Sequence, residues 1–141
     1  MQVIYTPIGV MHCRLKDPKT APRFYTESDV EGTIEIYPEY AQGLANLDEY
    51  RYIVVLFHFH RSTGYDLMQR RQGVGEMRGV FSLCSPNRPN SIGMSVLRLL
   101  CIEDNVLHVQ NVDILDGTPI LDIKPYKSTD YPQGPGQGVD C

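Results

Sequence analysis

The stretch Gly79-Val-Phe-Ser-Leu-Cys-Ser-Pro-Asn-Arg-Pro-Asn-Ser-Ile-Gly-Met94 places a proline-rich segment between two apolar runs. Its two prolines fix φ and lack N–H donors, which excludes both a helix and a central strand. The segment therefore predicts a stiff loop between two strands. Such a loop either serves only as a connection, or it holds Asn87, Arg88 and Asn90 in a binding site at low entropic cost.

Outside this loop the apolar segments are short and predict strands. Residues 52–57 are continuously apolar and rich in β-branched side chains, which predicts a buried central strand. Residues 33–37 alternate apolar and polar side chains, as in a strand with one solvated face. Residues 92–102 and 106–109 flank an Asp-Asn turn and predict a hairpin.

Helical patterning is confined to one place in the chain. Residues 39–49 have the spacing of a short amphipathic helix, whereas residues 61–78 are polar without a clear period and predict a long loop. Gly73-Val-Gly75 neither follows a strand nor opens a helix, so no dinucleotide-binding Rossmann domain is expected. The fold class is mostly β, a small single-domain barrel or sandwich with one short helix and long loops. Residues 1–127 form this domain in our prediction, and residues 128–141 a flexible tail rich in glycine and proline.

The composition is that of an ordinary globular domain of 141 residues, of which 42% are hydrophobic. No run approaches the roughly 18 apolar residues of a membrane span. The N-terminus lacks the basic region and apolar stretch of a signal peptide, so a cytoplasmic location is expected. The four cysteines include no C-x-x-C pair and are expected to be free thiols.

Charge is distributed unevenly along the chain. The net charge of −4 argues against non-specific binding of nucleic acid by the whole surface. Residues 61–88 nevertheless contain five arginines and only two acidic residues. This segment predicts a surface that faces an anion, unless its arginines pair with acidic residues elsewhere.

Two pairs of polar residues are candidates for chemistry. His58 and His60 would point to one face of a strand, as in many metal sites, but zinc or iron needs three protein ligands. Alternatively, one histidine is a hydrogen-bonded core residue and the other ends the strand. Asp113 and Asp116 either form a turn with the glycine that follows them or bind ribose hydroxyls or a cationic centre.

Two long stretches resemble the signatures of one protein family. Ser85-Pro-Asn-Arg-Pro-Asn-Ser-Ile-Gly-Met-Ser-Val96 resembles S-P-x-R-P-N-P-I-G-[LM]-S, with Ser91 in place of a proline. Asp113-Ile-Leu-Asp-Gly-Thr-Pro-Ile-Leu-Asp-Ile-Lys-Pro-Tyr126 is similar to D-L-x-D-G-T-P-[VL]-[LV]-D-I-K-P-Y. The family is the TsaA-like, or TrmO, group. Its characterised members use S-adenosylmethionine to methylate N6 of threonylcarbamoyladenosine at position 37 of tRNA.

The resemblance implies a small β-barrel that binds S-adenosylmethionine, usually as a homodimer, in a short stand-alone form of the family. The positions that match the family's cofactor contacts are Pro22, Arg23, His60, Arg61, Met94, Asp113, Ile114, Leu115 and Asp116. Arg88 and Asn90 are expected to bind and orient the cofactor or the substrate. Asp122, Lys124 and Tyr126 would position the acceptor base, and the arginines of residues 61–88 would hold tRNA phosphates.

A second hypothesis is a small-molecule or metal-binding β-barrel module that does not methylate RNA. Its basis is the acidic net charge, the presence of Cys84 where family members often carry arginine, and the His58/His60 pair.

Overall fold

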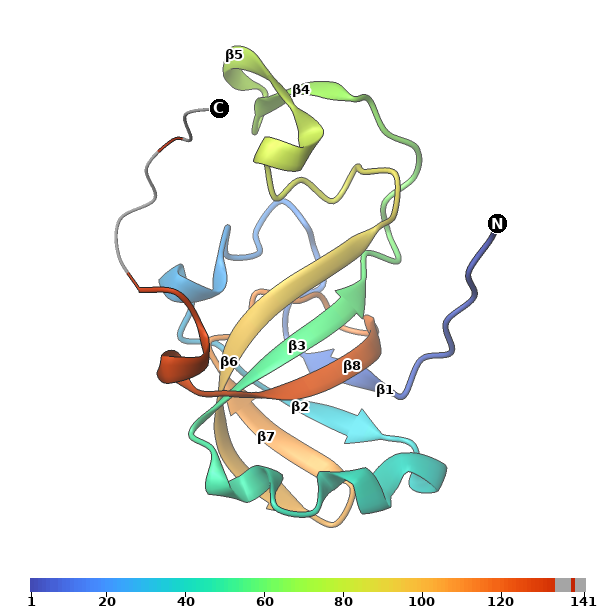
Figure 1. Ribbon diagram of the computed structural model, residues 1–141, viewed down its shortest axis with the longest axis vertical. Coiled ribbons are helices and arrows are strands. Elements are labelled where there is room, and N and C mark those ends of the chain that lie inside the picture. Colours follow the sequence, from blue (N-terminus) through green and yellow to red (C-terminus); the bar gives the residue numbers. More distant parts are fainter. Residues whose placement is uncertain (134–137, 139–141) are drawn as a thin grey trace.

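The chain closes six antiparallel strands into a barrel (Figure 1). In the computed structural model, which describes residues 1–133 and residue 138, the order around the barrel is β1-β2-β7-β6-β3-β8. The strands are β1 (Gly9–Cys13), β2 (Glu31–Ile36), β3 (Tyr52–His58), β6 (Ile92–Glu103), β7 (Val106–Gln110) and β8 (Pro119–Tyr126). The expected mostly-β barrel without a Rossmann domain is confirmed. Within the described residues, no helix has the length and apolar character needed to cross a membrane.

Alternate residues of the strands fill the barrel. Ile53, Val55 and Phe57 of β3 are at most 5% exposed, in agreement with the buried strand that their apolar run predicts. Leu97 of β6 and Leu107 of β7 are fully buried beside them. Each such side chain stabilises the fold by about 1.5–3 kcal/mol. The core therefore holds the barrel together, and the loops at its ends are available for other roles.

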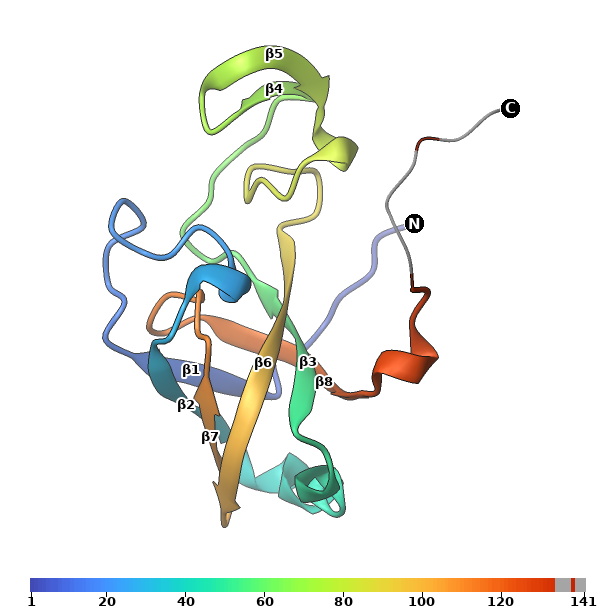
Figure 2. The same cartoon turned by 90° about the vertical axis from the view of Figure 1, so that its left-hand side faces the viewer.

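A second sheet projects from one end of the barrel (Figure 2). It consists of β4 (Met68–Arg71) and β5 (Val74–Gly79), a hairpin that we call the arm. The expectation of a long loop over residues 61–78 is therefore wrong. The two turn residues, Gln72 and Gly73, have φ of 51° and 74°, which two-residue hairpin turns favour. Because β5 is exposed along its whole length, the arm has no buried face that would produce an alternating pattern.

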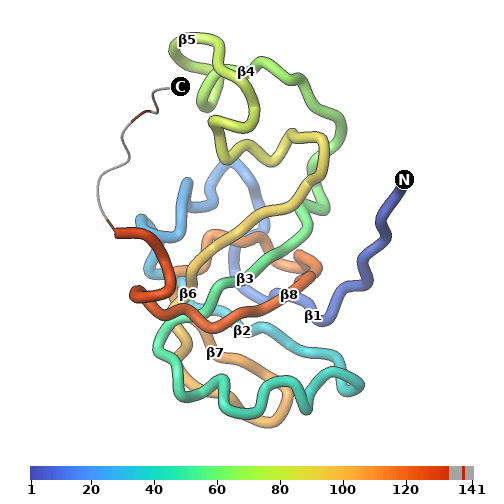
Figure 3. Tube along the Cα trace, viewed as in Figure 1, coloured from blue at the N-terminus to red at the C-terminus, as the bar shows by residue number. Residues whose placement is uncertain are grey.

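Helical structure takes the form of 3-10 turns. The helix expected at residues 39–49 is divided into η2 (Pro38–Leu44) and η3 (Leu47–Glu49), because Asn46 between them has a left-handed φ of 70°. These turns lie at the end of the barrel opposite the arm (Figure 3). The apolar run before the proline-rich loop, expected as a strand, forms η4 (Val80–Ser82), and η1 (Tyr25–Glu27) lies between β1 and β2.

The chain after β8 begins with the turn η5 (Ser128–Asp130). Tyr131 then stacks on Tyr126 with ring centroids 4.9 Å apart. Half of the segment expected to be flexible, residues 134–137 and 139–141, lies outside the described residues. The domain boundary at residue 127 and the flexible tail stay predictions.

Gly93 of β6 leaves no room for a side chain. A Cβ atom there would lie 2.5 Å from Cε2 of Phe57 and 2.7 Å from Cζ of Phe59, well inside van der Waals contact. We expect Gly93→Ala to lower the free energy of unfolding by about 1–3 kcal/mol, because the two rings must move. In Gly43→Ala the new Cβ would meet nothing within 4 Å, and we expect a change below about 1 kcal/mol. Urea denaturation followed by circular dichroism compares the two, and equal losses would contradict the steric explanation.

Candidate functional site

Three segments far apart in the sequence meet at the arm end of the barrel. They are the residues that follow β3, the proline-rich loop (residues 84–91) and the β7–β8 loop (residues 111–118), and together with residues before η1 they line a cavity of about 220 Å³. Phe57, Phe59 and Leu115 give it apolar walls. Polar groups are contributed by His60, Arg61, Ser62, Asn87 and Thr118. A mostly apolar cavity with a few placed polar groups is the usual form of a small-molecule site.

The proline-rich loop is held by hydrogen bonds from within and from outside. The hydroxyl of Ser62 donates to the carbonyl of Pro86 at 3.0 Å, and Nε2 of Gln69 donates to the carbonyl of Asn87 at 2.6 Å. Within the loop region, Nη1 of Arg88 donates to the carbonyls of Leu83 at 2.8 Å and Ser85 at 3.2 Å. Arg88 therefore maintains the shape of this loop, which agrees with the stiffness that the prolines predict.

The β7–β8 loop places two carboxylates in opposite environments. Asp116 accepts hydrogen bonds from Nζ of Lys16 at 2.7 Å and from the backbone N–H of Cys13 at 3.0 Å, and these bonds lower the pKa of Asp116. Asp113 accepts a hydrogen bond from the hydroxyl of Ser95 at 2.6 Å, and burial raises the pKa of Asp113. Asp116 thus anchors the loop to the chain after β1. Asp113 instead is a largely buried carboxylate that accepts a hydrogen bond from Ser95.

A larger cavity of about 680 Å³ lies beside the first and reaches the arm. Two residues of the proline-rich loop, Pro86 and Asn87, line both cavities. Arg23, Arg70 and Arg71 line the larger one, together with a single acidic residue, Glu27. Because the positive groups outnumber the acidic one, this cavity suits an anionic ligand.

The arginines of residues 61–88 do not form one patch. Arg70 and Arg71 of β4 face the larger cavity, where Arg23 joins them from a distant part of the chain. Arg78 instead pairs with Glu76 at 3.2 Å, and the guanidinium of Arg61 donates to the carbonyl of Lys16. Of the arginines in this segment, Arg78 is thus paired with an acidic residue, whereas the binding of an anion by Arg70 and Arg71 stays a prediction.

The residues expected to position an acceptor lie along β8. Asp122 and Lys124 form an exposed ion pair of 2.9 Å, and together with Tyr126 they line neither cavity. Asp122 and Met94 flank Leu56 on the outer face of the barrel, since both are its partners in the sheet. Met94, 52% exposed, also lines neither cavity.

Tyr25 of η1 is half-buried. Burial raises the pKa of Tyr25, and the nearby Asp113 carboxylate, Tyr126 and Cys84 raise it further. The ring of Tyr25 also packs against that of Phe24, which lines the larger cavity, with centroids 4.3 Å apart and the planes tilted by 31°.

The remaining expected cofactor residues are placed in several ways. Pro22 lies between Ala21, which lines the smaller cavity, and Arg23, which lines the larger one. Ile114 is 1% exposed and belongs to the core, and Asn90 is exposed and lines neither cavity. Of the cofactor positions, the structure thus brings His60, Arg61 and Leu115 to the smaller cavity and Arg23 to the larger one.

The expected arrangement of His58 and His60 on one strand face is wrong, because β3 ends at His58. Nδ1 of His60 lies 3.3 Å from the hydroxyl of Thr118, and partial burial lowers the pKa of His60. Among the described residues, the one group of three metal-ligating side chains does not include either histidine. The metal site proposed for this pair therefore has no third ligand among residues 1–133 and 138.

Sequence reasoning missed the residues that hold the loops in place. Ser62 and Gln69 carry no pattern that would single them out. Ser95 does carry a signal, because it shares the inward register of Leu97 and Leu99 on β6 and is fully buried. A polar residue at a core position requires a partner, which here is Asp113.

Comparison with known proteins matches residues 10–130 to the tRNA-methyltransferase O N-terminal domain. A probable S-adenosyl-L-methionine-binding protein of Pyrococcus abyssi is 43% identical over 127 residues, which cover 89% of this chain and 69% of the relative. The human tRNA (adenine(37)-N6)-methyltransferase is 36% identical over 128 residues, covering 85% of this chain and 29% of that protein.

A solved structure has the same fold. The crystal structure of TrmO from Pseudomonas aeruginosa aligns with a TM-score of 0.82 at 31% identity. The alignment covers 97% of this chain and 61% of that chain. The chain therefore spans less than two thirds of the crystallised protein.

The anchor at Asp116 makes stability depend on pH. Since the pKa of Asp116 is lowered in the folded state, its stabilising effect is complete above the ordinary pKa of aspartate and is lost as the pH falls through the lowered value. We expect Asp116→Asn to lower the free energy of unfolding by about 1 kcal/mol at pH 7, because the variant cannot form the charged hydrogen bonds. In acid, where Asp116 is protonated, the free energies of unfolding of the variant and the unmodified protein should converge.

Urea denaturation at several pH values measures this difference. Asp17→Asn is the control: it replaces an exposed aspartate in the chain after β1, whose side chain accepts only a local hydrogen bond, from the backbone N–H of Lys19. A constant difference between Asp116→Asn and the unmodified protein at every pH would contradict the assignment.

Proposed function

The chain belongs to the tRNA-methyltransferase O N-terminal domain family, and we propose that it transfers a methyl group from S-adenosylmethionine to N6 of an adenosine in tRNA. The proposed acceptor is threonylcarbamoyladenosine at position 37. The observation that carries the proposal is the meeting of both family signatures, in the proline-rich loop and the β7–β8 loop, at adjoining cavities. The names of the relatives support the cofactor and the acceptor position.

In this proposal the cofactor occupies the smaller cavity and the junction between the two cavities. The apolar walls formed by Phe57, Phe59 and Leu115 suit an adenosyl group, and Asn87 lies where the cavities adjoin. S-adenosylmethionine supplies the methyl group. The contribution of the chain is to hold donor and acceptor in line, and the hydrogen-bonded proline-rich loop is rigid enough for that task.

The larger cavity is the proposed entry for RNA. Arg23, Arg70 and Arg71 would hold phosphates of the anticodon loop, and this loop offers unstacked bases to protein side chains. In this proposal Tyr126 contacts the acceptor base, with Asp122 and Lys124 further along β8. A cytoplasmic location follows in this proposal from the tRNA substrate.

We also propose a homodimer through the outer face of β3, β6 and β8. Ile92, Met94 and Tyr52 on this face are 43%, 52% and 39% exposed, although they are apolar or aromatic. Side chains of this kind are enriched in the centres of protein interfaces. Burial of Met94 in such an interface would explain why a family position for cofactor binding lies outside both cavities of the single chain.

Calorimetric titration with S-adenosylmethionine and S-adenosylhomocysteine tests the cofactor site. We expect both to bind saturably with micromolar dissociation constants, which correspond to a binding free energy of about −8 kcal/mol. Leu115→Glu places a charge in the smaller cavity and should weaken both affinities at least about tenfold, because it replaces an apolar wall for the adenosyl group by a hydrated carboxylate. Ile4→Glu, at a position that is 86% exposed, is the matched control and should leave them unchanged. Absence of binding by the folded protein would overturn the proposed function.

The RNA surface has a separate test. Replacing Arg70 and Arg71 by alanine should weaken binding of a tRNA anticodon stem-loop and reduce the slope of log K against log salt by about 1 for each phosphate that is no longer bound. Binding of S-adenosylmethionine should be retained. Arg51→Ala, which alters an exposed arginine outside both cavities, is the control. Fluorescence anisotropy at several salt concentrations measures the slopes, and identical slopes for all proteins would exclude the larger cavity as the RNA surface.

A further inference from the structure

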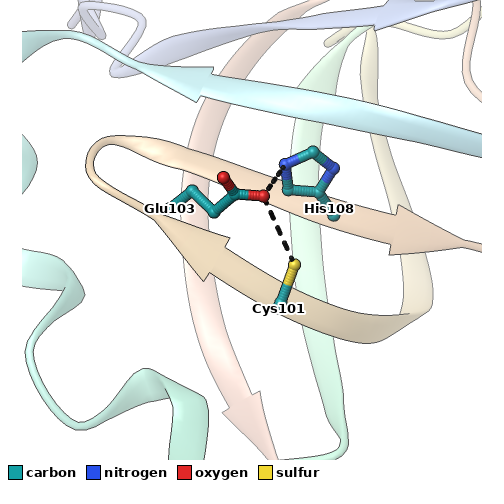
Figure 4. A group of neighbouring side chains, drawn as sticks. All are labelled: Cys101, Glu103 and His108. Carbon is teal, nitrogen blue, oxygen red and sulfur yellow. Dashed lines mark hydrogen bonds and ion pairs between the residues drawn. The ribbon is translucent and has the colours of Figure 1, made fainter.

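The hairpin formed by β6 and β7 carries a cluster of three metal-ligating side chains on the outside of the barrel (Figure 4). We propose that Cys101, Glu103 and His108 bind one divalent transition metal ion of the zinc type. The ligand atoms of the three side chains all lie within 4.8 Å of one another. Nε2 of His108 is 3.2 Å from Oε1 of Glu103, and Sγ of Cys101 is 4.0 Å from the same oxygen.

A β-bulge brings these residues onto one face. Leu97 and Leu99 of β6 point into the core, and unbroken alternation would direct Cys101 and Glu103 inward as well. The register of β6 against β7 shifts between Leu99 and Cys101. The additional residue reverses the alternation, so that Cys101 and Glu103 are exposed.

The bulge also determines which residues are neighbours across the hairpin. It sets Cys101 directly opposite His108, whereas Glu103 pairs with Val106 at the turn. Cys101 and Glu103 are two residues apart and therefore share a face of the strand. Bulges commonly re-aim a side chain where a strand serves a function.

The two distances to Glu103 are close to those of a tetrahedral zinc site. Zn–N and Zn–O bonds of about 2.0–2.2 Å place the two ligand atoms roughly 3.3 Å apart, and a Zn–S bond of about 2.3 Å places sulfur roughly 3.6 Å from oxygen. The observed His108–Glu103 distance of 3.2 Å already fits, and the Cys101–Glu103 distance of 4.0 Å requires a closure of a few tenths of an ångström. Because the side chains are largely exposed, small rotations can provide it.

The set of ligand atoms selects the class of metal. A thiolate with an imidazole and a carboxylate suits zinc and similar transition ions, whereas magnesium and calcium prefer oxygen ligands alone. Three protein ligands leave one coordination position for water. None of the three residues lines either cavity of the candidate functional site, so the ion would join β6 to β7 without taking part in methyl transfer.

A titration with Co²⁺ and Zn²⁺ tests the site in the full chain, after removal of any affinity tag and dialysis against a chelator. We expect one Co²⁺ per chain with a thiolate-to-cobalt absorption band, displacement of Co²⁺ by Zn²⁺, and a rise in Tm with Zn²⁺. Cys101→Ser should abolish the band, and His108→Asn should weaken Zn²⁺ affinity at least about tenfold. Glu103→Gln should weaken it as well.

Two matched variants serve as controls. Cys84→Ser removes another exposed cysteine, and His12→Asn removes a histidine that pairs with Glu35 at 3.0 Å on the outside of the same barrel. Both should retain the band and the affinity for Zn²⁺. Absence of stoichiometric binding by the unmodified protein, or a band that survives in Cys101→Ser, would overturn the proposal. Neither result depends on S-adenosylmethionine or RNA, so this test is separate from that of the proposed function.

Discussion

Closure of the barrel between β1 and β8 is the constraint on which the rest of the structure depends. The paired residues are few, Gly9 with Ile120 and Val10 with Pro119, and backbone hydrogen bonds from Ile8 to Ile120 and from Met11 to Thr118 extend the contact. On its other side β1 approaches β2 closely, and Gly9 permits this, because a Cβ atom there would collide with the carbonyl oxygen of Glu35 on β2. With the barrel closed, the six strands have no unpaired edge and the core is sealed.

The closure also positions the β7–β8 loop. That loop enters β8 at the point where β1 ends, so the chain after β1 lies against it, and the backbone of Asp116 donates to Leu15 while that of Gly117 donates to Met11. The side chain of Asp116 then binds Cys13 and Lys16. The proline-rich loop is held from another side by Ser62 and Gln69. The two signature loops are thus supported by segments that carry no family signature.

Much of the architecture follows from local patterns in the sequence. The buried strand at residues 52–57, the half-solvated strand at residues 33–37 and the hairpin around Asp104 are all observed, since apolar periodicity and turn chemistry act over a few residues. The arm and the divided 3-10 segment were not predicted correctly. The arm has no buried face, and the left-handed conformation of Asn46 interrupts a pattern that otherwise resembles a helix.

The mostly-β class, the rigid proline-rich loop and the family can all be recognised in the order of residues alone. These properties depend on residue type and short-range spacing, which are present in the chain before it folds. Only the tertiary structure decided which arginines face the larger cavity, that Asp116 anchors a loop while Asp113 is desolvated, and that a bulge brings Cys101 opposite His108. The reason is physical: burial, charge pairing and strand register depend on distances between segments that the linear order of residues does not specify.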